Sequence, residues 1–305
     1  MFSRIEKILF NFEELANYPI LIKCNRKTFT SKWTYDNKNI HKDLKSLVKK
    51  FNNIKLLIVL TTYSRPDGCM RVVKSAYNCL MYKNMKPEEV AFLVLNDKSQ
   101  SNYRTVKTHC QEILGEQLIW LDSKQHHGKK YFWCIHQMAF LVAREIMPTM
   151  YLYLQDDIDF SEDLLVKLDK LWMLTEQDKK REVIYLFSEQ NDDYDFNGRW
   201  INYRREIHPS GLLRKTQWFD LQAFYCGIKY LEFLRFWVTP VPEKRWKTDS
   251  TLSSGVGRQF TCRSFNKANV YQCSPSLITH GYEKSMMNPE ARLLLEFDNR
   301  TQLSD

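Results

Sequence analysis

The sequence lacks the segments by which proteins enter or cross membranes. No apolar run approaches the ~20 residues of a transmembrane helix, and the first seven residues include an acid and lack the long apolar core of a signal peptide. The eight cysteines include no Cys-x-x-Cys pair and lie mostly in apolar segments, which favours reduced core thiols over a disulfide framework or a zinc site. No heptad pattern is present that would predict an oligomer. These absences predict a cytoplasmic protein without a membrane span.

The composition is that of a folded protein with a basic N-terminal region. Of the 305 residues, 44% are hydrophobic and 27% are charged with both signs present, which excludes a disordered tail protein. The formal net charge is +9, and residues 1–55 hold twelve Lys or Arg against five Asp or Glu. Most of the basic excess therefore belongs to this region, which is either a surface for a polyanion or a solvated face that aids solubility.

Strand-like and helix-like segments alternate after residue 55. Residues 56–60 form a continuous apolar run, typical of a strand buried on both faces, and a polar turn and a helical segment follow. The expected strands are 56–60, 90–95, 118–121 and 151–154, and the expected helices are 68–81, 103–114, 131–147 and 161–174. This alternation predicts an α/β fold in which the strand ends collect the chemistry at one edge of the sheet.

Three carboxylates follow the fourth expected strand within four positions: Asp156, Asp157 and Asp159. Like charges this close raise each other's pKa unless a cation lies between them. A divalent ion with hard oxygen ligands, Mg²⁺ or Mn²⁺, would relieve the repulsion and would bring an anionic phosphate to the strand end. The alternative is that these acids cap the helix expected at 161–174, because acids favour a helix N-terminus.

Residues 59–66, Val-Leu-Thr-Thr-Tyr-Ser-Arg-Pro, with Ser75 on the next helix, resemble the first strand and loop of nucleotide-sugar glycosyltransferases of the GT-A fold. The resemblance implies a Rossmann-like mixed sheet flanked by helices, with Thr61, Tyr63 and Arg65 over the nucleotide and Asp97 at the base or ribose. Residues 157–159, Asp-Ile-Asp, match the family's Asp-x-Asp metal motif.

Other positions of the family pattern are matched in the same order along the chain. Residues 155–157, Gln-Asp-Asp, are similar to the Glu-Asp-Asp of N-acetylglucosaminyltransferase I, with Gln155 in place of Glu, and Asp157 belongs to both registers. By the same resemblance His280 completes the metal site with Asp157 and either Asp159 or Asp156, and Asp156 is also a candidate donor contact. The resemblance further makes Asp249 the candidate catalytic base of an inverting reaction and places Lys129, in the run His-His-Gly-Lys-Lys, facing the donor. Asp249 could equally cap a helix, and Lys129 could lie in a solvated loop.

Taken together, these features resemble those of a metal-dependent hexosyl- or pentosyltransferase. The domain organisation implied is a basic α+β appendage over 1–54 and a GT-A domain over 55–305, divided into a nucleotide-sugar half, 55–160, and an acceptor half, 161–305. The donor is expected to be a nucleoside-diphosphate sugar, with UDP compatible with Asp97 and GDP not excluded. Both an inverting and a retaining outcome remain open.

One segment of the second half bears on the acceptor. Residues 189–230 are rich in aromatic side chains and Arg, which suits sugar stacking, an unstacked base or a phosphate backbone. With the basic N-terminal region, this predicts double-stranded DNA carrying a hydroxymethylated base as acceptor, in the host cytoplasm if the chain is viral. The alternatives are a transferase for glycans or glycosylated proteins, and a catalytically silent nucleotide- or nucleic-acid-binding protein. A two-metal nuclease is disfavoured because no second acid cluster is present.

Overall fold

A computed structural model describes most of the chain from residue 46 to residue 280. The described residues are 46–98, 103–123, 126, 128, 131–175, 181–187, 206–216, 221–238, 255–264 and 267–280. Asp249, Lys129 and nearly all of the predicted N-terminal appendage lie outside these ranges, so their placement and the division into domains stay predictions.

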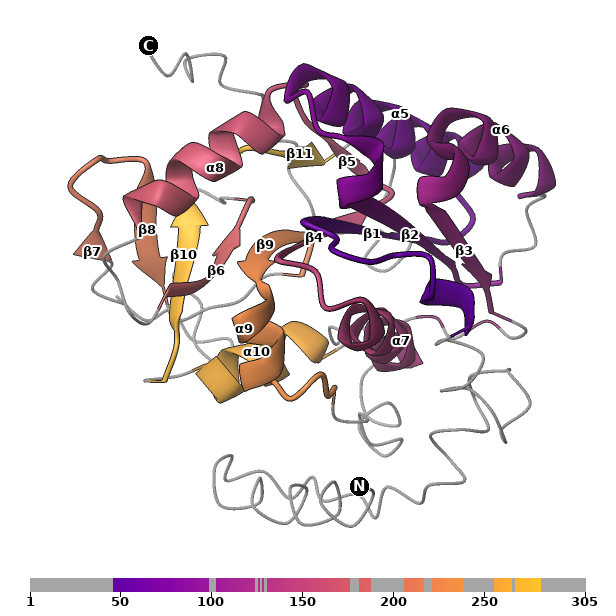
Figure 1. The fold of residues 1–305 in the computed structure, drawn as a ribbon. Coiled ribbons are helices and arrows are strands. Elements are labelled where there is room, and N and C mark those ends of the chain that lie inside the picture. The colour runs from indigo at the N-terminus through magenta and orange to yellow at the C-terminus, as the bar shows by residue number, and fades with distance from the viewer. Residues whose placement is uncertain are drawn as a thin grey trace, which may run out of the picture.

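The described part is built on a mixed sheet of nine strands in the order β3-β2-β1-β4-β9-β6-β10-β8-β7 (Figure 1). The strands are β1 Leu56–Thr62, β2 Val90–Asn96, β3 Leu118–Asp122, β4 Met150–Gln155, β6 Arg181–Tyr185, β7 Glu206–Ile207, β8 Leu213–Thr216, β9 Ala223–Gly227 and β10 Asn269–Cys273. Strands β1 to β4 are mutually parallel, whereas β9 runs antiparallel to β4 and β6. A separate antiparallel pair joins β5, Ile158–Asp159, to β11, Thr279–His280.

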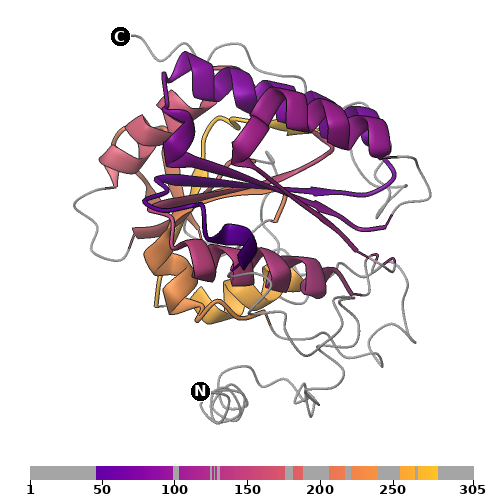
Figure 2. The same cartoon turned by 45° about the vertical axis from the view of Figure 1, so that its right-hand side comes forward.

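Helices cover both faces of the sheet, as the edge-on view shows (Figure 2). Helices α5, α6 and α8 lie on one face, and α7, α9 and α10 lie on the other. Their bounds are α5 Pro66–Tyr82, α6 Arg104–Leu114, α7 Phe132–Ile146, α8 Leu164–Leu174, α9 Ile228–Phe233 and α10 Val256–Ser264, with short 3₁₀ turns at Pro87–Glu89 and Gly115–Gln117. Among the described residues, no helix is both long and apolar enough to span a membrane.

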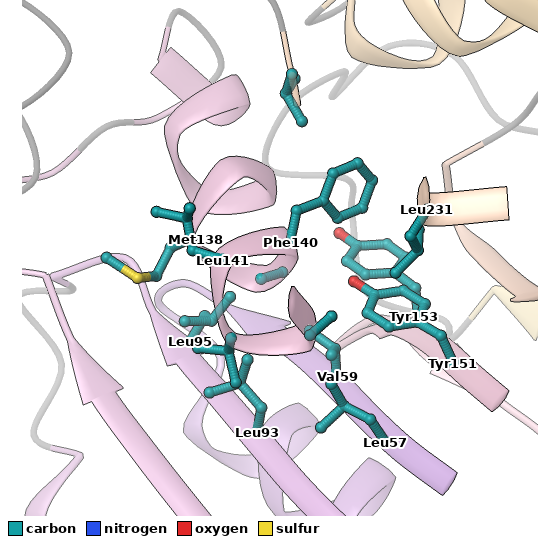
Figure 3. Close-up of a cluster of buried hydrophobic side chains, with 14 of the residues drawn as sticks. Leu57, Val59, Leu93, Leu95, Met138, Phe140, Leu141, Tyr151, Tyr153 and Leu231 are labelled. Carbon is teal, nitrogen blue, oxygen red and sulfur yellow. The ribbon is translucent and has the colours of Figure 1, made fainter. Parts of the chain in front are cut away.

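The two helical layers explain why the central strands are continuous apolar runs. Successive side chains of a strand point to opposite faces, so Leu57 and Val59 of β1 pack toward α7 while Ile58 and Leu60 pack toward α5. Figure 3 shows the α7 side of this core, where β1, β2 and β4 meet the helix. Each such buried side chain stabilises the fold by roughly 1.5–3 kcal/mol relative to exposure.

The observed elements confirm the predicted α/β class, a mixed sheet flanked by helices. All four expected strands and the helices that follow them are present, with ends shifted by at most three residues. The helix-cap interpretation of the acids is wrong. Helix α8 begins at Leu164 with Asp163 at its N-cap, and β5 separates it from Asp156 and Asp157.

His136 of α7 is a polar side chain in the middle of this core. It is fully buried, and its two ring nitrogens have no hydrogen-bond partner among the described residues. Its ring contacts those of Phe132 and Tyr153, with centroids 4.8 and 4.6 Å away. Burial lowers the pKa of His136 from 6.5 to about 3, because folding would remove the charged imidazolium from water.

We therefore expect His136 to make the protein acid-sensitive. The unfolded chain takes up this proton near pH 6.5 and the folded chain only near pH 3, so the free energy of unfolding falls as pH drops through that window, by about 1.4 kcal/mol per unit. His136→Phe keeps a ring in the core but has no titrating group. Its free energy of unfolding should therefore rise by about 2 kcal/mol relative to that of wild type as the pH drops from 6.5 to 5. Urea unfolding at the two pH values measures this difference. His109→Gln, on the exposed face of α6, is the control and should not become more stable than wild type at pH 5. If the free energy of unfolding of His136→Phe falls with pH as steeply as that of wild type, His136 is not the cause of the acid sensitivity.

Candidate functional site

The carboxyl ends of three parallel strands meet at one edge of the sheet. Thr62 at the end of β1 is in register with Asn96 at the end of β2, and Thr61 is in register with Gln155 at the end of β4. The residues that follow these strands therefore lie together, as open α/β sheets place their ligand sites. Among them are the predicted donor residues Tyr63, Arg65, Asp97 and Asp156 and the predicted metal ligand Asp157.

Asp156 fastens the loop after β1 to the end of β4. One oxygen of its buried carboxylate, Oδ2, accepts hydrogen bonds from the Thr62 hydroxyl at 2.7 Å and from the Tyr63 backbone N–H at 3.0 Å. Burial, together with the negative charge of neighbouring Asp157, raises the pKa of Asp156 to about 7, against the hydrogen bonds of Thr62 and Tyr63 and the charge of Arg65, which act in the opposite direction. Asp156 thus fixes the conformation of the loop after β1, and its contact with the donor stays a prediction.

Arg65 places a cation between the acids. Its Nη1 lies 2.9 Å from Oδ2 of Asp157 and 3.7 Å from Oδ1 of Asp156, and its side chain is only 7% exposed. The backbone holds it there, since the Arg65 N–H donates to the Tyr103 hydroxyl at 2.9 Å and the Arg65 carbonyl accepts from the Cys69 N–H at 2.9 Å. Pro66 follows as the first residue of α5, so this helix starts beside the acids.

Gly68 allows α5 to approach the strand end this closely. A Cβ built on Gly68 would lie 2.4 Å from the backbone carbonyl oxygen of Asp156, a distance that real Cβ atoms do not tolerate. The start of α5, the loop after β1 and the acid turn after β4 therefore form one packed unit.

Asp97 holds a second loop at the same edge. Its carboxylate Oδ2 accepts from the Gly128 N–H at 2.8 Å and lies 3.1 Å from Nδ1 of His126, and its side chain is only 4% exposed. The ring of His126 stacks on that of Tyr63, with centroids 4.0 Å apart and planes 15° apart. Asp97 therefore positions an aromatic pair, of which His126 is partly exposed.

The structure does not bring the three predicted metal ligands together. Asp159 forms an ion pair with Arg71, Nε to Oδ1 at 2.6 Å. In the β5–β11 ribbon Thr279 pairs with Asp159 and His280 pairs with Ile158, so the alternation of side chains sends His280 and Asp159 to opposite faces. Within the described ranges, no group of three His, Cys, Asp or Glu side chains is arranged to hold a metal ion. Asp157, Asp159 and His280 as a complete set stay a prediction.

Asp157 by itself fits a divalent cation. Its Oδ1 is buried and has no hydrogen-bond partner among the described residues, whereas its Oδ2 faces Arg65. An unpartnered carboxylate oxygen is a suitable hard donor for Mg²⁺ or Mn²⁺, and Mg²⁺ is often held by one or two carboxylates together with substrate phosphates. The residues present therefore fit a metal shared between Asp157 and a phosphate ligand.

Sequence reasoning missed the residues that lock the site together. Thr62 lies inside the matched run 59–66 but was not singled out, and Gly68 and Tyr103 belong to no motif. The roles of all three come from contacts between separate segments. Only Tyr103 carried a usable signal, because an aromatic residue before a helix and after the second strand lies at the same edge as the acids.

Comparisons with known proteins give structural neighbours only. No protein-family model and no curated protein matches the chain. Similar solved structures are S. aureus TarS 1-349 (11% identity, TM-score 0.47, 72% of this chain and 60% of that one) and the same protein in complex with UDP-GlcNAc (12%, 0.49, 79% and 62%). Another is the mannosyltransferase PcManGT from Pyrobaculum calidifontis in complex with GDP-Man and Mn²⁺ (13%, 0.46, 76% and 62%).

One of these neighbours is thus a mannosyltransferase, and two of the structures hold a nucleotide sugar. The chain spans about 60% of the length of the neighbours reported above. At such identities and with TM-scores below 0.5, the likeness carries no argument about what this chain binds, and the assignment of function rests on the site itself.

Proposed function

We propose that this protein transfers a sugar from a nucleoside-diphosphate sugar to an acceptor hydroxyl. The observation that carries the proposal is the edge formed by β1, β2 and β4. There an aromatic pair, an arginine and a carboxylate oxygen without a hydrogen-bond partner among the described residues lie on loops fastened to one another. A base, a diphosphate and a divalent cation are the three ligand parts that this set of groups would recognise.

Each group has a part to play in holding the donor. The Tyr63–His126 stack offers a ring surface for the base, positioned by Asp97. Arg65 and the N-terminus of α5 favour an anionic diphosphate, through a guanidinium fork and through the helix dipole. Thr61 holds the Tyr153 hydroxyl at 2.8 Å and so stiffens the strand end behind the loop.

Asp157 would hold the divalent cation, Mn²⁺ or Mg²⁺, with Asp159 and His280 as further candidates. When bound, such an ion stabilises the negative charge that grows on the leaving diphosphate. Lys129 would add positive charge beside the same group. If the reaction inverts the anomeric centre, Asp249 is the proposed base that removes the proton of the acceptor hydroxyl; a retaining reaction would not need a base there.

The test is the slow hydrolysis of a panel of nucleotide sugars by the wild-type protein, with and without Mn²⁺. We expect metal-dependent release of one nucleoside diphosphate, with UDP-linked sugars tested first. A folded protein that releases no diphosphate and binds neither nucleotide nor Mn²⁺ would refute the transferase and favour a binding module.

For the acceptor we propose a hydroxymethylated base in double-stranded DNA. The support is the basic N-terminal sequence and the aromatic and basic composition of residues 189–230. Binding to duplex DNA should weaken steeply as salt rises, because phosphate contacts release counterions. If the protein does not bind duplex DNA, or binds it with an affinity that does not change with salt, DNA is excluded as the acceptor and a glycan or a protein takes its place.

A further inference from the structure

The acid cluster already contains a buried cation of its own. Arg65 and Asp157 are 7% and 13% exposed, and Nη1 lies 2.9 Å from Oδ2. A guanidinium stays charged in proteins, so one of the two carboxylate oxygens of Asp157 is paired while the other, Oδ1, has no hydrogen-bond partner among the described residues. In the metal-free protein Arg65 therefore already offsets part of the negative charge of Asp157.

This pairing has a consequence for a divalent cation at Asp157. A second positive charge bound to Oδ1 would lie within a few ångströms of the guanidinium, in a region where little water screens the repulsion. Conversely, without Arg65 the buried carboxylates of Asp156 and Asp157 would face each other without a counter-charge from this arginine. The arginine therefore keeps the acids in place in the metal-free protein and opposes metal binding.

Building on the proposed function, we propose that Arg65 competes with the divalent cation for Asp157 and transfers its guanidinium to the donor diphosphate when the cation binds. The backbone of Arg65 is fixed by Tyr103 and by the first turn of α5, so only the side chain has to move. A diphosphate is a suitable new partner because guanidinium pairs bidentately with phosphate oxygens. Arg65 then makes metal and donor bind together, and each tightens the binding of the other by the same factor.

The experiment is a titration of Mn²⁺ followed by electron paramagnetic resonance, alone and with the nucleoside diphosphate of the best donor. Wild type should bind Mn²⁺ at least about tenfold more tightly when the diphosphate is present, the size of a typical coupling between sites. Arg65→Gln should bind Mn²⁺ alone about tenfold more tightly than wild type, because a like charge has been removed. The same variant should lose most of the tightening by the diphosphate.

The direction of the first effect separates competition from simple damage. A purely structural arginine would give unchanged or weaker Mn²⁺ binding when replaced, never tighter binding. Lys83→Gln is the matched control, since Lys83 pairs with Asp169, an acid outside the proposed metal site. Its Mn²⁺ affinity should stay within about threefold of wild type, as expected for a surface ion pair. Tightening in Lys83→Gln but not in Arg65→Gln would overturn the proposal.

Two further outcomes keep the proposal testable. If Arg65→Gln does not fold, Arg65→Lys takes its place, because lysine retains the charge but not the guanidinium fork. In this variant the factor by which diphosphate tightens Mn²⁺ binding should be at least about threefold smaller than in wild type. An unchanged factor would refute the inference. If wild type binds both ligands but a folded Arg65→Gln binds Mn²⁺ no more tightly, this inference is overturned and the proposed function stands. Wild type that binds neither ligand overturns both.

Discussion

Asp157→Ala is expected to reduce metal-dependent hydrolysis of the donor by about 10²–10³-fold or more, the range found when one electrostatic stabiliser of the transition state is removed. Asp157 supplies the buried carboxylate oxygen that has no hydrogen-bond partner among the described residues, and it follows β4, beside the loop after β1 that carries Arg65. Release of nucleoside diphosphate by wild type and variant at saturating Mn²⁺ measures the effect.

Two other substitutions make this result specific. Asp157→Asn keeps the size of the side chain and should be nearly as inactive, because an amide is a poorer ligand for a divalent cation than a carboxylate. Asp169→Ala removes an acid that pairs with Lys83 between α8 and α5, so its turnover should match wild type. If Asp157→Ala releases nucleoside diphosphate as fast as wild type, Asp157 has no role in the reaction.

Gly68→Ala is expected to cost about 3 kcal/mol of stability, at the upper end of what overpacking usually costs. The added Cβ would meet the backbone carbonyl oxygen of Asp156 at 2.4 Å, and no rotamer change can move either atom. Relief requires α5 to shift from the strand end, which would also pull Arg65 away from Asp157 and loosen the donor loop. Donor affinity should therefore fall together with stability.

Urea unfolding and nucleotide binding of the same variant test both parts of this prediction. Gly227→Ala is the control, because its Cβ would meet Trp172 at 3.5 Å, an ordinary contact. It should cost less than about 1 kcal/mol, as for a well-tolerated substitution. A Gly68→Ala protein with wild-type stability would show that α5 and the acid turn are not packed as described.

The first half of the fold was predictable because its signals are local. The run 56–60 is apolar at every position, since alternate residues pack against α7 and α5, and this is a property of the sequence alone. The end of β4 was predictable in the same way, from four apolar residues followed by charge. The order of the strands across the sheet, with β9 between β4 and β6, depends on contacts that no local pattern records.

The site was predictable only as a set of positions, not as an arrangement. Asp97 was expected at the base or ribose of the donor, which stays a prediction, but its contacts with His126 and Gly128 were not foreseen, because no spacing rule connects these residues to it. His280 was expected at the acid turn and does pair with β5, but the register places Thr279 opposite Asp159. A shift of one residue in register decides which side chain faces the acid, and sequence does not resolve such a shift.

The central claim, that a nucleotide binds at the edge formed by β1, β2 and β4, is tested most directly by calorimetric titration of UDP and GDP in the presence of Mn²⁺. We expect wild type to bind at least one of them and Tyr63→Ala to bind it about tenfold more weakly, because loss of a stacking ring typically costs 1–3 kcal/mol. Binding of neither nucleotide by folded wild type, or equal affinity in Tyr63→Ala, would contradict the account.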